Sequence, residues 1–413
     1  MDYMKNKKPV DRNGNIISIR GLNNPQILQD YTSALKTAVF KCGYQDIIVE
    51  IFNSRGFFPN VVVPLCGIND YFQSQGVQFT IVENSLNLSN HVLSSHDPSV
   101  EPSELNRPLS KIWRFHNNQD INDVQNAIIS ELRKEEVFAD GVLEGIEWSI
   151  NEVMDNVLNH SEADCGYIMS QLHKNSKHVA FTIFDSGRGI YNSFHGSKHI
   201  VRSNADALSL CLQEGVTRDP NVGQGNGMCG LFSLIKEGNG ILNISSGRDT
   251  YSYRNGETNI TQDSVCSISK KLGCTTVDFQ LDYSKDISID KVLTFQGRTF
   301  SFINLFVEDL EDDNGVLLFS VNKMAEGTGT RESALRLKNQ IINSIKAQNK
   351  CAIIDFEGIN VVSSSFIDEL IAKLLIDLGL FQFNRRISLR RMSPLLQKTL
   401  QKSVIQRIIE DYN

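Results

Sequence analysis

Apolar side chains change their spacing several times along the chain, and each change predicts a different element. In residues 25–42 they recur every three or four positions, as in an amphipathic helix. Residues 46–51 (DIIVEI) and 77–82 are short apolar runs typical of buried strands. The pattern predicts a small α/β domain within 1–110, after a flexible lead-in at 1–20.

A connection rich in Ser, Asn, Pro and His, residues 84–118, leads to a second predicted domain over 120–308. Residues 123–160 have two helical patterns separated near Asp140-Gly141. The strands that follow are predicted at 166–173 and 178–184 (a hairpin), 240–245, 250–253, 275–281 and 299–306.

The last part of the chain, residues 315–413, predicts a third domain that begins after the acidic segment 308–314. Its strands are predicted at 316–321, 351–356 and 385–389, and its helices at 331–347, 366–380 and 395–409. DIIVEI, a helix and FTIV near the N-terminus are similar to AIIDFEG, a helix and RISL here, so the two ends are expected to share a fold. The predicted fold class is α/β, an α+β sandwich with two smaller α/β domains at its ends.

The net charge and the cysteines disfavour several classes of protein. The 413 residues carry a net charge of −7, which disfavours a protein that binds nucleic acid through bulk charge. From Ser320 onwards, however, the chain contains 14 Lys and Arg residues and only nine Asp and Glu residues. The polar start and the lack of long apolar runs predict neither a secretory signal nor a membrane span. The eight scattered cysteines form no CxxC pair, which disfavours zinc and predicts a cytoplasmic protein with reduced thiols.

Three polar elements carry the candidate chemistry, and the first lies on the helix predicted before residue 160. Glu152, Asn156 and His160 recur every four residues, so they share one helix face. A carboxylate and an amide there can hold a water molecule and part of the shell of Mg²⁺. The alternative is a solvated polar stripe.

The second element, Asp185-Ser-Gly187-Arg-Gly189, directly follows an apolar strand. A carboxylate at a strand end can accept a hydrogen bond from the exocyclic amine of a base. Glycines beside it allow close approach of a ligand. The alternative is a tight strand-to-helix turn.

The third element, Gly223-Gln-Gly225-Asn-Gly227-Met-Cys-Gly230, precedes an apolar helix. Free N–H groups and a helix N-terminus form a site for phosphates. The alternative is a flexible loop. No GK[ST] follows, so this is not a Walker loop.

In this order and spacing the three elements resemble the GHKL ATPase superfamily, whose nucleotide site is the Bergerat fold. The resemblance covers about 120–306, and it implies ATP and Mg²⁺ as cofactors. By resemblance, Glu152 is the catalytic general base, Asn156 coordinates Mg²⁺, Asp185 with Gly187 and Gly189 binds adenine, and Gly223, Gly225 and Gly227 bind phosphate.

The superfamily pattern ends with a Gly-Thr pair whose hydroxyl lies near the base. Two segments fit it with one inserted residue: Gly273-Cys-Thr275-Thr276 and Gly297-Arg-Thr299. The second leads into an alternating strand, which favours Thr299 over Thr275 and Thr276.

The C-terminal domain resembles the STAS-like domain of unknown function that follows GHKL modules in bacterial proteins. The matching residues are 353–359 and Ser363 to Leu370. Ser363, Ser364 and Ser365 are candidate phosphoacceptors at a helix N-terminus. The simpler interpretation is a helix capped by Ser365.

A cluster of four arginines, Arg385, Arg386, Arg390 and Arg391, lies near the last predicted strand. Nucleic acid or an acidic protein surface would suit it, but a solvated strand edge is favoured.

The leading hypothesis is an intracellular, ATP-binding regulatory switch that hydrolyses ATP and uses its STAS-like domain to contact a protein partner or a second copy. The alternatives are a serine protein kinase of the anti-sigma type and a non-hydrolysing ATP sensor that dimerises. Glu152 favours turnover, although the motif does not distinguish water from a protein hydroxyl as acceptor.

Overall fold

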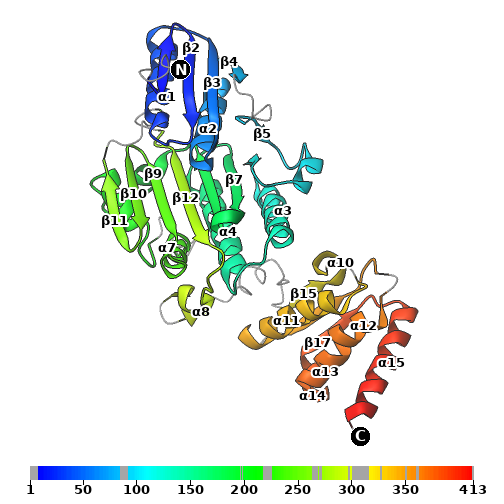
Figure 1. The fold of residues 1–413 in the computed structure, drawn as a ribbon. Coiled ribbons are helices and arrows are strands. Elements are labelled where there is room, and N and C mark those ends of the chain that lie inside the picture. Colours follow the sequence, from blue (N-terminus) through cyan, green and yellow to red (C-terminus); the bar gives the residue numbers. More distant parts are fainter. Residues whose placement is uncertain are drawn as a thin grey trace. The chain divides into compact units, whose positions relative to one another are not determined.

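The computed structural model describes residues 8–83, 92–195, 197, 199–216, 226–262, 268, 272–295, 298–299, 316–325, 328–348, 351–359 and 362–411. The chain divides into two compact units, residues 1–299 and 300–413 (Figure 1). It is a mixed α/β protein with several sheets. No described helix combines the length and the apolar character needed to cross a membrane.

A four-stranded sheet begins the first unit, in the order β1-β2-β3-β4. Its elements are β1 (Val10–Asn13), β2 (Ile16–Leu22), α1 (Ile27–Lys36), η1 (Thr37–Lys41), β3 (Asp46–Phe57), α2 (Pro59–Ser74) and β4 (Gln78–Glu83). Strands β2, β3 and β4 are parallel, and β1 is antiparallel to β2.

The predicted lead-in at 1–20 is wrong where β1 and β2 lie. Ile17 and Ile19 alternate with more exposed residues and are fully buried. Gly14, at φ 62°, makes the turn between the two strands. This alternation, with its Gly14-Asn15 turn, was the available signal.

An eight-stranded sheet forms the larger part of the first unit, in the order β11-β10-β9-β12-β8-β7-β6-β5. The strands are β5 (Ser95–His96), β6 (Ile112–Phe115), β7 (Gly166–His173), β8 (His178–Asp185), β9 (Ile241–Ser246), β10 (Asp249–Arg254), β11 (Glu257–Thr261) and β12 (Thr275–Asp282). β5 and β6 belong to this sheet, although the sequence predicted a connection there. The predicted limit at residue 110 therefore does not separate two folds.

Helices cover both faces of this sheet (Figure 1). α3 (Asn118–Glu135), α4 (Val142–His160) and α7 (Gly227–Glu237) pack on one face. α2 packs on the other, against β7, β8 and β12. The shorter elements of this unit are η2 (Pro102–Asn106), η3 (Lys174–Ser176), α5 (Gly189–Ser193), α6 (Asn204–Leu210), α8 (Ile289–Val292), β13 (Thr294–Phe295) and β14 (Arg298–Thr299).

One hydrophobic core joins the two sheets. The buried residues of α1, α2 and β3 form a single cluster with Tyr167, Met169 and Phe184 of the larger sheet. Burial of this shared apolar surface makes residues 1–299 one unit rather than two.

The helix pair predicted over 123–160 is confirmed, with its break at Gly141. Asn117 caps α3 by accepting a hydrogen bond from Asp120 N at 3.0 Å. Gly141 adopts φ 77°, and a Cβ there would lie 2.1 Å from the Ile287 carbonyl oxygen, so only glycine fits. The predicted hairpin at 166–184 is confirmed as β7 and β8.

The second unit is a parallel sheet in the order β15-β16-β17. Its elements are β15 (Leu317–Ser320), α10 (Val321–Met324), α11 (Arg331–Gln348), β16 (Ala352–Asp355), α12 (Ser364–Ile367), η4 (Asp368–Ala372), α13 (Lys373–Leu378), α14 (Leu380–Arg386), β17 (Ile387–Arg390) and α15 (Pro394–Asp411). The predicted strands and helices are confirmed with shifted limits. Buried apolar residues of the sheet, of α11 and of the segment from α12 to α13 form one hydrophobic core.

Candidate functional site

Asp185 lies at the end of β8, in the middle of a row of residues that crosses four strands. It pairs with Gly166 of β7 on one side and with Thr275 of β12 on the other. Thr275 in turn pairs with Ser246 of β9. The row brings together residues that are up to 109 positions apart in the sequence, between Gly166 and Thr275.

The Asp185 carboxylate is buried, with 4% of its surface exposed. Its Oδ1 accepts a hydrogen bond from Gly187 N at 2.9 Å, and the Thr275 hydroxyl also donates to it. Burial raises the pKa of Asp185 to about 7, and these two neutral donors only partly oppose the rise. A buried carboxylate with spare acceptor capacity suits a ligand that offers N–H groups.

The loop after Asp185 is closely packed against α4 and β9. A Cβ on Gly187 would lie 2.2 Å from the Ser161 carbonyl oxygen, and one on Gly189, at φ 78°, would lie 2.9 Å from Ser246 Oγ. Ile190 N donates to that same Ser246 hydroxyl at 2.8 Å. Both glycines are therefore required by the fold of the loop, whatever its ligand.

Glu152 and Asn156 lie one turn apart on α4, both half-buried. Burial and the neighbouring Asp155 carboxylate raise the pKa of Glu152 to about 7. Glu152 reaches the start of α7: a Cβ on Gly227 would lie 2.2 Å from its Oε2. A carboxyl group with a pKa near neutrality can take up and release a proton at physiological pH.

The glycine-rich segment is described only at its end. Gly227 is the first residue of α7, whereas Gly223 and Gly225 lie outside the described residues. Asn226, just before α7, accepts a hydrogen bond from Gly215 N at 3.2 Å through its side chain. The structure thus brings Glu152 and Gly227 together, 75 positions apart in sequence.

The threonine beside Asp185 is Thr275, not Thr299, which the sequence favoured. Thr299 lies in β14, which pairs with β13 as a small two-stranded sheet. Thr276 pairs with Phe184 and so faces the opposite side of the sheet from Thr275. The strand predicted at 299–306 falls, beyond Thr299, outside the described residues.

Two serines at this site were missed by sequence reasoning. Ser246 accepts from Ile190 N, donates to the Cys274 carbonyl oxygen at 3.1 Å and lies 3.4 Å from the Thr275 hydroxyl. Ser161 accepts from Arg188 N at 2.8 Å through its carbonyl. No local pattern marks either residue, because their roles depend on strand pairing and helix packing.

The described residues offer few ligands for a metal ion at this site. Among the described residues, no group of three or more His, Cys, Asp or Glu side chains could hold one. Asn156 remains a candidate single ligand, on the same face of α4 as Glu152.

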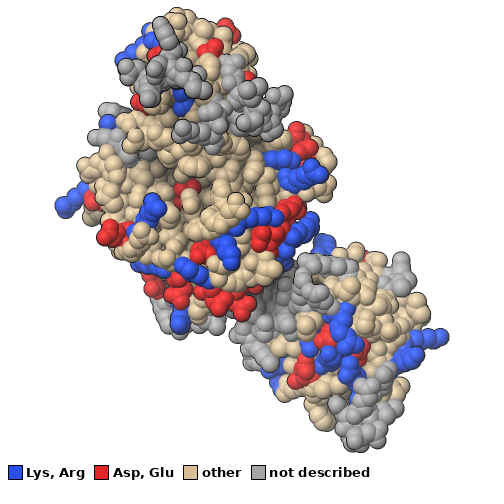
Figure 2. Space-filling view, in the orientation of Figure 1, with Lys and Arg blue, Asp and Glu red and all other residues tan. Residues whose placement is uncertain are grey.

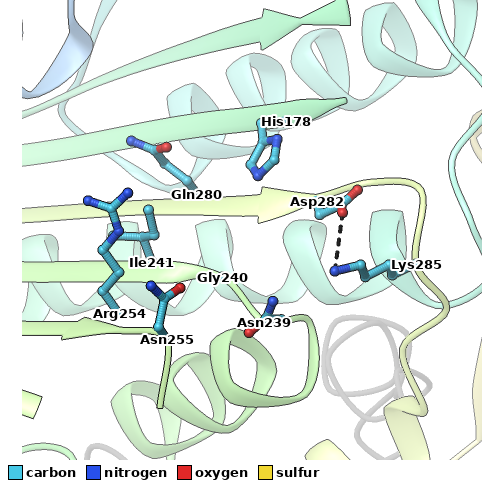
Figure 3. A pocket seen from close by; sticks show the side chains of 9 residues that line it. All are labelled: His178, Asn239, Gly240, Ile241, Arg254, Asn255, Gln280, Asp282 and Lys285. Carbon is cyan, nitrogen blue, oxygen red and sulfur yellow. Dashed lines mark ion pairs between the residues drawn. The ribbon is translucent and has the colours of Figure 1, made fainter. Parts of the chain in front are cut away.

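A cavity of about 260 Å³ lies at the other end of β8 and β12 from Asp185 and Thr275. Figure 3 shows the side chains that line it. Its lining comes from β8, β9, β10, β12 and the turns beside them: His178, Asn239, Gly240, Ile241, Arg254, Asn255, Gln280, Asp282 and Lys285. Lys285 and Asp282 form an ion pair at 3.5 Å. None of the sequence-predicted site residues lines it.

In the second unit Ser363, not Ser365, caps the helix. Ser363 Oγ accepts from Phe366 N at 3.0 Å and lies 3.0 Å from Ser365 Oγ. Ser364 is exposed, whereas Ser363 and Ser365 are half-buried. Of the three candidate phosphoacceptors, Ser364 is therefore the most exposed residue.

The four arginines near β17 do not form one free basic patch. Arg391 pairs with both Asp355 and Glu357, the latter at 2.6 Å. Arg385 and Arg386 end α14, and Arg390 ends β17. In Figure 2, basic and acidic side chains are interleaved on the visible face of this unit.

Comparison with known families identifies part of the second unit. Residues 333–396 match the family model of the STAS-like domain of unknown function, DUF4325. This match includes Ser363 to Ser365 and the four arginines, and it stops short of the first unit. A search of curated proteins finds no match. The C-terminal domain is therefore STAS-like, which suggests a role in contacting a partner.

Proposed function

We propose that the first unit binds Mg·ATP in a GHKL-type, Bergerat-fold site and that the protein acts as a nucleotide-dependent switch. The observation that carries this proposal is the row through Asp185 and Thr275, with Gly187 and Gly189 directly after it. Asp185, Gly187 and Gly189 belong to one sequence motif, and strand pairing adds Thr275 beside them. This arrangement supports the proposal because the resemblance implies these residue types around a base-reading carboxylate. The STAS-like domain would pass the nucleotide state to a protein partner or a second copy.

Each residue of the site has a distinct task in this proposal. Asp185 accepts the exocyclic amine of adenine, and Thr275 takes the role first assigned to Thr299. The N-terminus of α7, beginning at Gly227, and the Gly223–Gly225 segment bind phosphates. Glu152, with its pKa of about 7, takes the proton of the attacking water.

Mg²⁺ fits the residues present. This ion keeps several waters and is commonly held by one or two protein oxygens plus the phosphates of a substrate. Asn156 supplies one such oxygen from the same helix face as Glu152. When bound, the ion would neutralise charge on the phosphates.

A serine protein kinase is the second candidate, and the exposed hydroxyl of Ser364 favours it. In that case the γ-phosphoryl group passes to a protein hydroxyl rather than to water. A non-hydrolysing sensor would retain binding through Asp185 and lack both transfers.

Two substitutions test the proposal in one titration and turnover experiment on the full chain. Asp185→Asn replaces an acceptor oxygen with an amide NH2 group, which is a hydrogen-bond donor, so ATP affinity measured by calorimetry should fall at least ~100-fold. Glu152→Gln should keep affinity within about threefold and lose phosphate release.

The wild-type result separates the candidates. Free phosphate indicates hydrolysis, label on protein indicates a kinase, and binding without either indicates a sensor. Wild-type affinity in Asp185→Asn would refute the site itself.

A further inference from the structure

Helix α2 crosses the eight-stranded sheet on the face opposite α4 and α7 (Figure 1). Three of its residues contact three neighbouring strands. Asn60 Nδ2 donates to Asp278 Oδ2 of β12 at 3.1 Å, Gly67 lies against Phe184 of β8, and Asp70 accepts from the Tyr167 hydroxyl of β7 at 2.9 Å. Positions 60, 67 and 70 share one face of a helix.

These contacts are made next to the row that contains Asp185. Tyr167 follows Gly166, Phe184 precedes Asp185, and Asp278 is three residues after Thr275. Successive residues of a strand face opposite sides of a sheet. Phe184 therefore faces α2, while Asp185 faces the proposed nucleotide site.

The contact at Gly67 leaves no room for adjustment. A Cβ on Gly67 would lie 2.4 Å from the Phe184 ring, so the helix backbone rests directly on that ring. Phe184 is 2% exposed. Because protein cores are closely packed, a shift of α2 must move Phe184 and the end of β8 with it.

A buried polar group fixes the other end of the contact. Asp278, 2% exposed, accepts from Thr182 Oγ1 at 2.9 Å and from Asn243 Nδ2 at 3.1 Å as well as from Asn60. Of these three donors only Asn60 belongs to α2, so a rotation or slide of the helix would break its hydrogen bond to the buried Asp278 carboxylate, and the loss of such a bond is costly. The helix is therefore held in one position across β12, β8 and β7.

We propose that α2 is a positioning element for the nucleotide site: through Gly67 and Phe184 it sets where the Asp185 carboxylate lies relative to the base. This inference rests on the proposed function. It assigns the N-terminal sheet, whose second crossover helix is α2, a part in base recognition.

The test measures discrimination between ATP and inosine triphosphate, which lacks the exocyclic amine that Asp185 would accept. Wild type should prefer ATP at least ~100-fold, because the unpaired carboxylate penalises the analogue. Gly67→Ala should reduce that ratio about tenfold, because its methyl group displaces Phe184 and with it Asp185. Phe184→Leu in the same chain makes room for the methyl group and should restore the ratio.

Two further variants keep the result interpretable. Gln73→Ala, on an exposed position of the same helix, should leave the ratio unchanged. Tyr167→Phe removes only the hydroxyl that donates to Asp70 and should lower the ratio by a smaller factor, even where Gly67→Ala fails to fold.

The outcomes separate the inference from the proposed function. A loss of overall stability without a change in the ATP-to-inosine triphosphate ratio, in Gly67→Ala or in Tyr167→Phe, would mean that α2 is only structural. A wild-type protein without ATP affinity would overturn the proposed function and this inference with it.

Discussion

The carboxylates of the candidate site in the first unit and those of η4 in the second unit have opposite surroundings. In the first unit, Asp185 accepts hydrogen bonds from two neutral donors, the Gly187 N–H and the Thr275 hydroxyl. The charged group that shifts the pKa of Glu152 is another carboxylate, that of Asp155. In the second unit, Asp368 accepts from Arg407 Nε and Nη2 at 2.8 and 2.7 Å. Its neighbour Glu369 pairs with Lys373 at 2.6 Å and lies 3.6 Å from Lys338.

The contrast shows which of these carboxylates lowers the stability of the fold when it is ionised. Burial raises the pKa of Asp185 to about 7, whereas the Arg407 hydrogen bonds lower the pKa of Asp368 below its usual value. A buried acid without a cation partner makes the folded state less stable once ionised. Such groups are concentrated at functional sites, whereas paired ones more often serve stability. Replacing Asp185 and replacing Asp368 by asparagine should therefore change the free energy of unfolding in opposite directions.

The largest effect is expected for Asp185→Asn in the absence of nucleotide. The pKa of Asp185 is raised on folding, so its stabilising contribution is full below pH 3.8 and is lost as the pH rises through about 7. The neutral amide avoids this loss, so at pH 8 the variant should be more stable by up to about 4 kcal/mol. Urea denaturation at pH 8 and pH 5 should show the gain shrinking by more than half at pH 5. A variant less stable than wild type at pH 8 would make Asp185 a structural residue.

Asp368→Asn should have the opposite sign. It removes a charge-assisted pair of hydrogen bonds with Arg407, so the free energy of unfolding at pH 7 should fall by about 2 kcal/mol. The pKa of Asp368 is lowered on folding, so this contribution is present above pH 3.8 and is lost as the pH falls through the lower folded value. Asp377→Asn is the matched control, because its pair with Lys338 leaves Asp377 44% exposed and should contribute less than about 1 kcal/mol. An equal loss in both variants would remove the contrast between them.

A smaller effect distinguishes the two threonines of the first unit. Thr275→Val removes the hydroxyl that donates to Asp185 and should weaken ATP binding about tenfold, or 1.4 kcal/mol. Thr299→Val, in β14, should leave affinity unchanged. The reverse result would restore the assignment favoured by the sequence and exclude Thr275 from the site.

Local patterns were enough to predict most elements but not their partners. The break at Gly141, the β7–β8 hairpin and the strand–helix order of the second unit each depend on spacing or on one turn. The choice between Thr275 and Thr299 depends instead on which strand pairs with β8, and pairing between distant strands leaves no local mark. Ser246 and the contact of α2 with the larger sheet could not be predicted for the same reason, because both depend on contacts between distant segments.

The remaining errors concern short strands. β1 has four residues, β2 has seven and β5 has two, so the sequence pattern over each of them is short. For the site, Asp185, Gly187 and Gly189 were predictable because they are contiguous. Their burial and the resulting pKa near 7 follow from tertiary packing.

The smallest effect concerns the serines of the second unit, where structure and regulation can be separated. Ser363→Ala removes the cap of α12 and should cost about 1 kcal/mol in urea denaturation. Ser364→Ala, one residue later and exposed, should cost almost nothing. If the chain is a kinase for its own STAS-like domain, mass spectrometry after incubation with ATP should find phosphate on Ser364, and Ser364→Ala should remove it while Ser363→Ala should not. Phosphate on Ser363 in the wild type would mean that the cap opens, and the modification would then act by destabilising the start of α12.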